Sequence, residues 1–129
     1  MDLRLGTLTQ VLQPVTDLDR AVVFYRDALQ LRLIGHFGSI AFFDLDGVRL
    51  LLEPGDRASG SVLYLEVPDI HTARDELAER GIAFEQEPHL IHRDDTGVFG
   101  RPGAETWMAF FRDTEANLLA IVCSDQAVA

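Results

Sequence analysis

The chain repeats its own pattern, and this duplication constrains the fold more than any other feature. Three pairs of short segments match, namely Val15–Leu18 with Val67–Ile70, Ala41–Phe43 with Ala109–Phe111, and Leu50–Leu51 with Leu118–Leu119. The first pair is offset by 52 residues and the other two by 68 residues. Each half therefore predicts a strand, a helix and several further strands. Such a duplication also predicts pairs of equivalent positions at which a binding site would be built.

Capping residues, turn residues and periodicity predict the elements of the first half. Asp17 is placed to cap a helix, and apolar residues follow it at helical spacing. Asp46-Gly47 is typical of a hairpin turn. The expected elements are a strand at about 7–15, a helix at 18–29, and strands at 31–37, 39–45 and 49–53.

The second half shows the same order with a longer insert. Asp69 predicts a second helix start, and Gly81 a helix end. The expected strands lie at 61–67, 83–85, 90–92, 106–112 and 118–123, with a Gly-, Pro- and Asp-rich loop at 94–104 that is either a lid or disordered. We expect a single domain over 1–129, with module 1 at about 6–54, a linker at 55–60, and module 2 at about 61–124.

Composition excludes several classes of partner. The chain has 11 basic and 21 acidic residues, a net charge of −10, which disfavours binding to nucleic acids and to anionic membrane surfaces. No apolar run approaches the ~20 residues of a membrane span, and the first residues do not resemble a secretory signal. Cys123 is the only cysteine. These features predict a cytoplasmic protein without disulfides.

Two segments resemble a known superfamily. The helix end Phe24–Leu29 and the closing hairpin Ala109–Leu119 look like those of the vicinal oxygen chelate superfamily, which includes glyoxalase I, bleomycin-resistance proteins and extradiol dioxygenases. The resemblance implies an α+β fold of two βαβββ modules that form an open cup, and a homodimer. The sequence departs from the pattern at Gln30 and Ala116, where glycine is usual, and at Thr114, where proline is usual.

The resemblance also implies where superfamily members hold a divalent metal. The ligand positions on the first strands fall on Gln10 and Val62, and those on the last strands on Ala120 and, by the 68-residue offset, Leu52. Only Gln10 could ligate a metal, whereas zinc, nickel and harder cations need imidazole or carboxylate ligands in number. Glu53 is expected to face the opposite side of its strand. The sequence therefore predicts no metal and no cofactor.

Aromatic and aliphatic residues dominate the strands that would line the cup. The resemblance assigns Phe42 and Phe110 to the ligand-facing side, and alternation adds Ile40 and Met108. Such walls suit a small hydrophobic or aromatic molecule, although these side chains could instead pack the sheets against the helices. The predicted ligand-binding residues are Gln10, Ile40, Phe42, Leu52, Val62, Tyr64, Met108, Phe110 and Ala120.

Two other functions remain open. One is an enzyme, either a divergent metal-dependent lyase, isomerase or dioxygenase, or an acid–base isomerase using His89, His92 or Glu66. Alternation along a strand predicts that His89 and His92 face opposite sides, and all three residues could equally be solvated surface groups. The other is a structural or regulatory dimer whose cup is filled by its own side chains.

Overall fold

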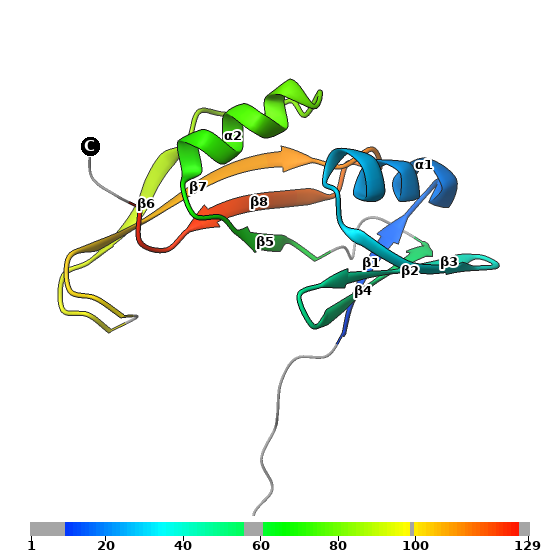
Figure 1. The fold of residues 1–129 in the computed structure, drawn as a ribbon, viewed down its shortest axis with the longest axis horizontal. Coiled ribbons are helices and arrows are strands. Elements are labelled where there is room, and N and C mark those ends of the chain that lie inside the picture. The colour runs from blue at the N-terminus through cyan, green and yellow to red at the C-terminus, as the bar shows by residue number, and fades with distance from the viewer. Residues whose placement is uncertain (1–9, 56–60, 99, 127–129) are drawn as a thin grey trace, which may run out of the picture. The chain divides into compact units, whose positions relative to one another are not determined.

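The structure, a computed structural model, describes residues 10–55, 61–98 and 100–126 of the chain. The chain forms two compact units, Met1–Ser61 and Val62–Ala129, which we call the first and second modules (Figure 1). Their boundary lies beside the predicted linker at 55–60, most of which falls outside the described residues. Each module has a four-stranded sheet and follows the order βαβββ. The predicted α+β class with two βαβββ modules is confirmed.

The first module places its first strand beside its last. Its elements are β1 (Gln10–Val15), α1 (Leu18–Val23), the π-helical turn η1 (Phe24–Ala28), β2 (Arg32–Phe37), β3 (Ile40–Leu45) and β4 (Val48–Pro54). The sheet order is β1-β4-β3-β2, with β1 parallel to β4 and the other pairs antiparallel. Both helix ends match the sequence. Asp17 caps α1 by accepting from the Arg20 amide at 3.1 Å, and Gln30 follows η1 with a left-handed φ of 55°.

The second module has the same topology. Its elements are β5 (Leu63–Glu66), α2 (Ile70–Glu79), β6 (His89–Asp94), β7 (Ala104–Arg112) and β8 (Leu118–Cys123). The sheet order is β5-β8-β7-β6, with β5 parallel to β8. The strand predicted at 83–85 is wrong, because only a single bridge joins Phe84 to Phe111 there. Within the described residues, no helix is long and apolar enough to cross a bilayer.

The core of the first module lies between its sheet and α1–η1. Tyr25 is fully buried there, with its ring 5.8 Å from that of Phe43. Gln13 is also fully buried on this side of the sheet, and its side-chain oxygen and nitrogen have no hydrogen-bond partner within the described structure. A buried unpaired amide costs about 1–3 kcal/mol. This polar residue therefore destabilises an otherwise apolar core.

The core of the second module lies under α2 and is fixed at its edge by side-chain hydrogen bonds. Phe84 and Phe111 meet edge to face at 5.3 Å. The Gln126 side chain accepts from the Ile70 amide at 2.7 Å and donates to Asp69, the N-cap of α2. Hydrogen bonds from the Thr72 hydroxyl, from Gln126 and from the Thr72 amide lower the pKa of Asp69 from 3.8 to about 2.

Candidate ligand-binding faces

Each sheet has one face covered by its helix and an opposite side that we call the open face. Residues that pair across strands point to the same face, so the register assigns every side chain. The open face of the first module comprises Gln10, Leu12, Pro14, Arg32, Gly35, Phe37, Ile40, Phe42, Asp44, Arg49, Leu51 and Glu53. That of the second comprises Tyr64, Glu66, His89, His92, Asp94, Ala104, Thr106, Met108, Phe110, Arg112, Leu118, Ala120 and Val122, with Val62 just before β5.

The two hairpins that end the modules differ in length by one residue. Phe43 pairs with Leu50, seven positions later, whereas Phe111 pairs with Leu119, eight positions later. The short hairpin turns at Asp46-Gly47, and the longer one spans 113–117. The offset between modules is therefore 68 residues before the turn and 69 after it. The position in the first module that is equivalent to Ala120 is thus Leu51.

This extra residue corrects the predicted side of β4. Leu52 pairs with Ala41 and is fully buried against the helix side, so its placement on the ligand-facing side is wrong. Leu51 takes that place beside Phe42. Glu53 lies on the same side of β4 as Leu51, whereas the sequence predicted that it would face the helix side.

The remaining predicted residues lie where the strand alternation placed them. Gln10, Ile40, Phe42, Tyr64, Met108, Phe110 and Ala120 are all on open faces, and Val62 precedes β5 with partial exposure. Ala120 is buried nevertheless, because it is small and lies between Tyr64 and Phe110 on the neighbouring strands. Tyr64 is 55% exposed. The structure thus brings these side chains to two surfaces, one on each module.

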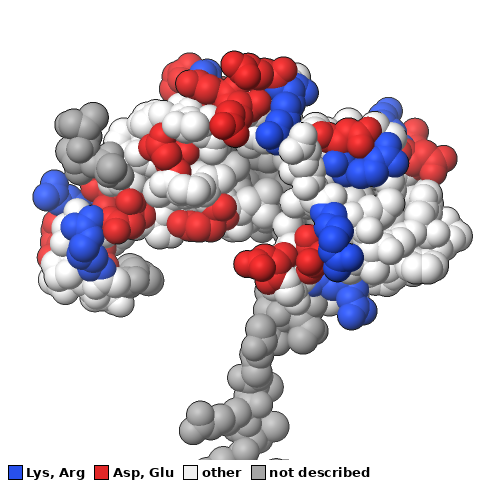
Figure 2. All heavy atoms as spheres, in the orientation of Figure 1, with Lys and Arg blue, Asp and Glu red and all other residues white. Residues whose placement is uncertain are grey.

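The open face of the first module divides into polar and apolar rows. One row across the four strands reads Gln10, Arg49, Asp44 and Arg32. The next reads Leu12, Leu51, Phe42 and Gly35. Figure 2 shows acidic and basic groups together beside the β3–β4 turn and a mostly uncharged surface towards the β2–β3 hairpin. The face therefore offers an apolar surface with a charged border.

Exposed aromatic and aliphatic groups form the apolar surface of this face. Leu12 is 47% exposed and Phe37 59% exposed. The Phe37 ring lies over Gly35, where an added Cβ would meet a ring carbon at 2.3 Å, and its centroid is 6.1 Å from that of Phe42. The absence of a side chain at Gly35 therefore leaves the space that the Phe37 ring occupies.

A bulge in β6 places two histidines on the same face. His89 pairs with Met108 and His92 with Thr106, and the register shifts between Leu90 and His92. Because Met108 and Thr106 are two positions apart on β7, both histidines lie on the open face. The prediction that they face opposite sides is wrong. The His89 ring also stacks on Phe110 with centroids 6.0 Å apart.

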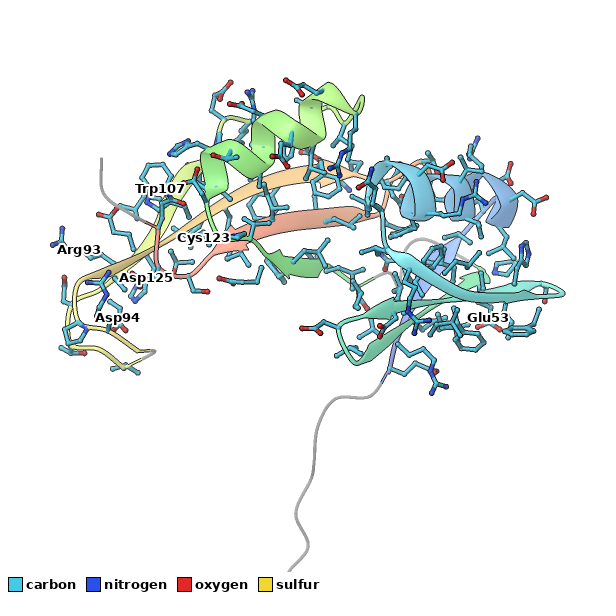
Figure 3. The ribbon with its side chains drawn as sticks, viewed as in Figure 1. Glu53, Arg93, Asp94, Trp107, Cys123 and Asp125 are labelled. Carbon is cyan, nitrogen blue, oxygen red and sulfur yellow. The ribbon has the colours of Figure 1, made fainter. Side chains whose placement is uncertain are left out.

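Glu66 and Cys123 have local structural contacts at the end of the second sheet. The carboxylate of Glu66 accepts from the Ser124 amide at 3.1 Å and from the Ser124 hydroxyl at 2.9 Å. Cys123 is buried and its thiol donates to the Pro68 carbonyl at 3.4 Å. Figure 3 labels Cys123 on β8 and Trp107 on β7. The thiol is therefore packed away from solvent.

Sequence reasoning missed several residues of the open face of the first module, and three of them lie beside Gln10 or Phe42, namely Leu12, Arg49 and Leu51. The last two lie on β4 and were missed because the register of that strand was predicted incorrectly. The unequal spacing of the turn residues, Asp46-Gly47 against Asp113–Asn117, is the signal that could have revealed them. Leu12 lies on the same side as Gln10, and strict alternation along β1 would have found it.

A family model covers most of the chain. The Glyoxalase/Bleomycin resistance protein/Dioxygenase superfamily model matches residues 7–121. The chain belongs to this superfamily. No curated protein sequence matched it.

Solved structures of the superfamily share the fold. A glyoxalase/bleomycin resistance protein/dioxygenase from Nocardioides has a TM-score of 0.74 at 19% identity, covering 98% of this chain and 89% of that one. Lactoylglutathione lyase from Agrobacterium tumefaciens has a TM-score of 0.70 at 18% identity, covering 93% and 95%. A similar protein from Alicyclobacillus acidocaldarius gives 0.68 at 22% identity, covering 92% of each chain. At these identities the likeness shows the fold alone.

The residues at the superfamily's metal positions do not fit a divalent cation. With the register corrected, these positions are Gln10, Leu51, Val62 and Ala120. One amide oxygen cannot replace the hydration shell of a hard cation, and a zinc or nickel site needs more than one strong donor. In the described parts of the chain, no three His, Cys, Asp or Glu side chains are grouped as metal ligands would be. Glu53 is two positions beyond Leu51 and does not restore the set.

Proposed function

We propose that this superfamily member binds a small hydrophobic or aromatic molecule on the open faces of its sheets without a metal. One observation carries the proposal: the open faces carry exposed apolar rings and chains at positions next to those where metal ligands would be required. Phe37, Leu12 and Tyr64 are the main exposed examples, and Phe42 on the same face is half-buried. Apolar surface with a few polar groups is typical of small-molecule sites, and exposed apolar patches often mark binding surfaces.

Binding of a neutral aromatic probe tests this function. Naphthalene-2-carboxamide should bind in buffer with EDTA as well as in buffer without it, as measured by isothermal titration calorimetry. Phe42→Ala and Phe110→Ala should each weaken binding several-fold because they remove aromatic contact area. Val98→Ala is the matched control, since Val98 is equally apolar and highly exposed but lies in the 95–103 loop. Binding that appears only after metal is added would contradict the proposal.

The histidine pair favours a second candidate, an acid–base isomerase. His89 and His92 share the open face of the second module, and the His89 ring rests on Phe110. An imidazole can accept a proton from carbon and return it. Exchange of the α-proton of acetoin in D2O, followed by NMR, would reveal this activity. The exchange should disappear in His89→Gln or His92→Gln if either residue is the base.

We also propose that the protein acts as a cytoplasmic homodimer. The buried single thiol of Cys123 and the acidic composition support a cytoplasmic setting, and the resemblance to the superfamily supports the dimer. Light scattering coupled to gel filtration measures the mass directly. A mass near 29 kDa, twice the 14.4 kDa of the chain, is expected.

A further inference from the structure

The two arginines in the polar row on the open face of the first module differ in whether they have an ion-pair partner among the described residues. Asp44 accepts from the Gly47 amide at 3.0 Å and lies 3.6 Å from the Arg32 guanidinium. Arg49, which pairs with Asp44 on one side and with Gln10 on the other, makes no ion pair or hydrogen bond with the described residues through its side chain. The row therefore contains two cations and one anion, and the anion is engaged with Gly47 and Arg32.

An aromatic ring holds the Arg49 guanidinium against the sheet. Its central carbon lies 5.7 Å from the centroid of the Phe42 ring. An arginine stacked in this way keeps the edge of its planar guanidinium free for two parallel hydrogen bonds to a carboxylate. Less side-chain entropy is then lost on binding, because the fork is already oriented.

The apolar row begins directly beside this cation. Leu51 is two residues along β4 from Arg49, and Leu12 and Phe42 flank Leu51 on the neighbouring strands. A cation at the border of an exposed apolar surface is complementary to a flat molecule with an anionic end. Glu53, the other carboxylate on this face, is four residues from Arg49, or about 13 Å along a strand. Glu53 is therefore too far away to form an ion pair with the Arg49 guanidinium.

The second module carries no such cation at the equivalent position. Leu118 takes the place of Arg49, and Val62 takes that of Gln10. The arginine of this row, Arg112, is bonded to Glu85 at 2.6 Å and to the Ala116 carbonyl at 3.1 Å. An available cation beside an apolar row is therefore a feature of the first module and not of the shared scaffold.

We propose that the ligand of this protein is an aromatic carboxylate. Its carboxylate binds the Arg49 guanidinium with help from the Gln10 amide, and its ring system lies on the row of Leu12, Leu51 and Phe42. The inference rests on the proposed function, since it names the class of molecule that the apolar surface accepts. It also predicts selection against cationic aromatics, which Arg49 would repel.

Two probes of the same shape test the assignment. Naphthalene-2-carboxylate and naphthalene-2-carboxamide have the same ring system and differ in charge. We expect the carboxylate to bind about tenfold more tightly by calorimetry at low salt, because a charge-assisted bidentate pair replaces neutral hydrogen bonds. In Arg49→Met the preference should vanish while the affinity for the amide persists. Arg112→Met is the control, because it removes the same charge from an arginine that is already paired.

The outcomes separate this inference from the function on which it rests. Equal affinity for the two probes, or a preference that survives Arg49→Met, would overturn the assignment of a carboxylate to Arg49 and leave apolar binding intact. Failure of both probes to bind at millimolar concentration would overturn both proposals. Chemical-shift changes centred on β1, β3 and β4 upon carboxylate titration would support the site, and changes confined to β5–β8 would contradict it.

Discussion

The two modules share a scaffold but differ at the residues that face away from their helices. Both begin with a strand parallel to their last strand, and both helices start at an aspartate cap. Arg49 of the first module corresponds to Leu118 of the second, and Gln10 to Val62. On the first strand the cores differ in polarity at one position, where the buried Gln13 of the first module corresponds to Leu65. The shared scaffold therefore does not depend on the side chains of the open faces, and these side chains differ between the two modules.

The hairpin comparison shows how a duplication can mislead about a site. The same strand order tolerates one extra residue in a turn, yet one residue changes which side chains of the following strand face outward. In the longer hairpin, the Asp113 carboxylate accepts from the Glu115 and Asn117 amides, both at 2.8 Å, and so closes the turn without the usual proline and glycine. Turn chemistry, more than sequence similarity, sets the register of β4 and β8.

The largest expected effect tests which side of β4 is buried. Leu52→Ala should lower the free energy of unfolding by about 2–5 kcal/mol because it leaves a cavity in the core. Leu51→Ala, on the open face, should cost about 1 kcal/mol or less. Urea denaturation followed by circular dichroism measures both. A larger loss for Leu51→Ala would restore the original 68-residue alignment and refute the corrected register.

The next prediction removes the difference in polarity at this position of the first strand. Gln13→Leu, which copies Leu65, should raise the free energy of unfolding by about 1–3 kcal/mol, because a buried amide without partners is replaced by an apolar group. Pro14, next along β1, belongs to the open face, so its substitution should not reproduce the gain. A destabilised Gln13→Leu variant would mean that the amide has a partner in solution.

A smaller gain should come from the two positions that depart from the superfamily's glycines. Gln30 has a φ of 55° and Ala116 a φ of 65°, a region that side chains disfavour by about 1 kcal/mol. Gln30→Gly and Ala116→Gly should each raise the thermal midpoint by a few degrees. Gly38→Ala, at a φ of 61°, should lower it and serves as the reverse control.

The smallest expected effect concerns the loss of stability at acidic pH. The folded-state pKa of Asp69 is about 2, below its usual 3.8, so its contribution to stability is full above pH 3.8 and is lost as the pH falls through 2. NMR titration of the carboxyl carbon should give this value. Thr72→Val removes the hydroxyl donor at 2.6 Å and should move the pKa towards 3.8. An unchanged pKa in this variant would assign the shift to other groups.

Local sequence signals predicted the scaffold. The features that they missed depend on the register between strands that are distant in sequence. Both aspartate caps could be predicted without ambiguity, because capping depends only on neighbouring residues. Asp46-Gly47 likewise predicted the turn of the first hairpin. The faces of β1, β3, β5 and β7 followed from alternation. The face of β4 required the pairing between strands, and the bulge near Ile91 in β6 has no glycine or proline to mark it. Arg49 was therefore outside what alternation could identify.

Metal analysis of tag-free protein tests the central claim, that this superfamily scaffold has lost its metal site, most directly. The protein would be incubated separately with Ni, Zn, Mn and Fe(II), desalted, and measured by inductively coupled plasma mass spectrometry. The donor set of Gln10, Leu51, Val62 and Ala120 predicts far less than one ion per chain for every metal. One retained ion per chain that is lost in Gln10→Ala would contradict the account.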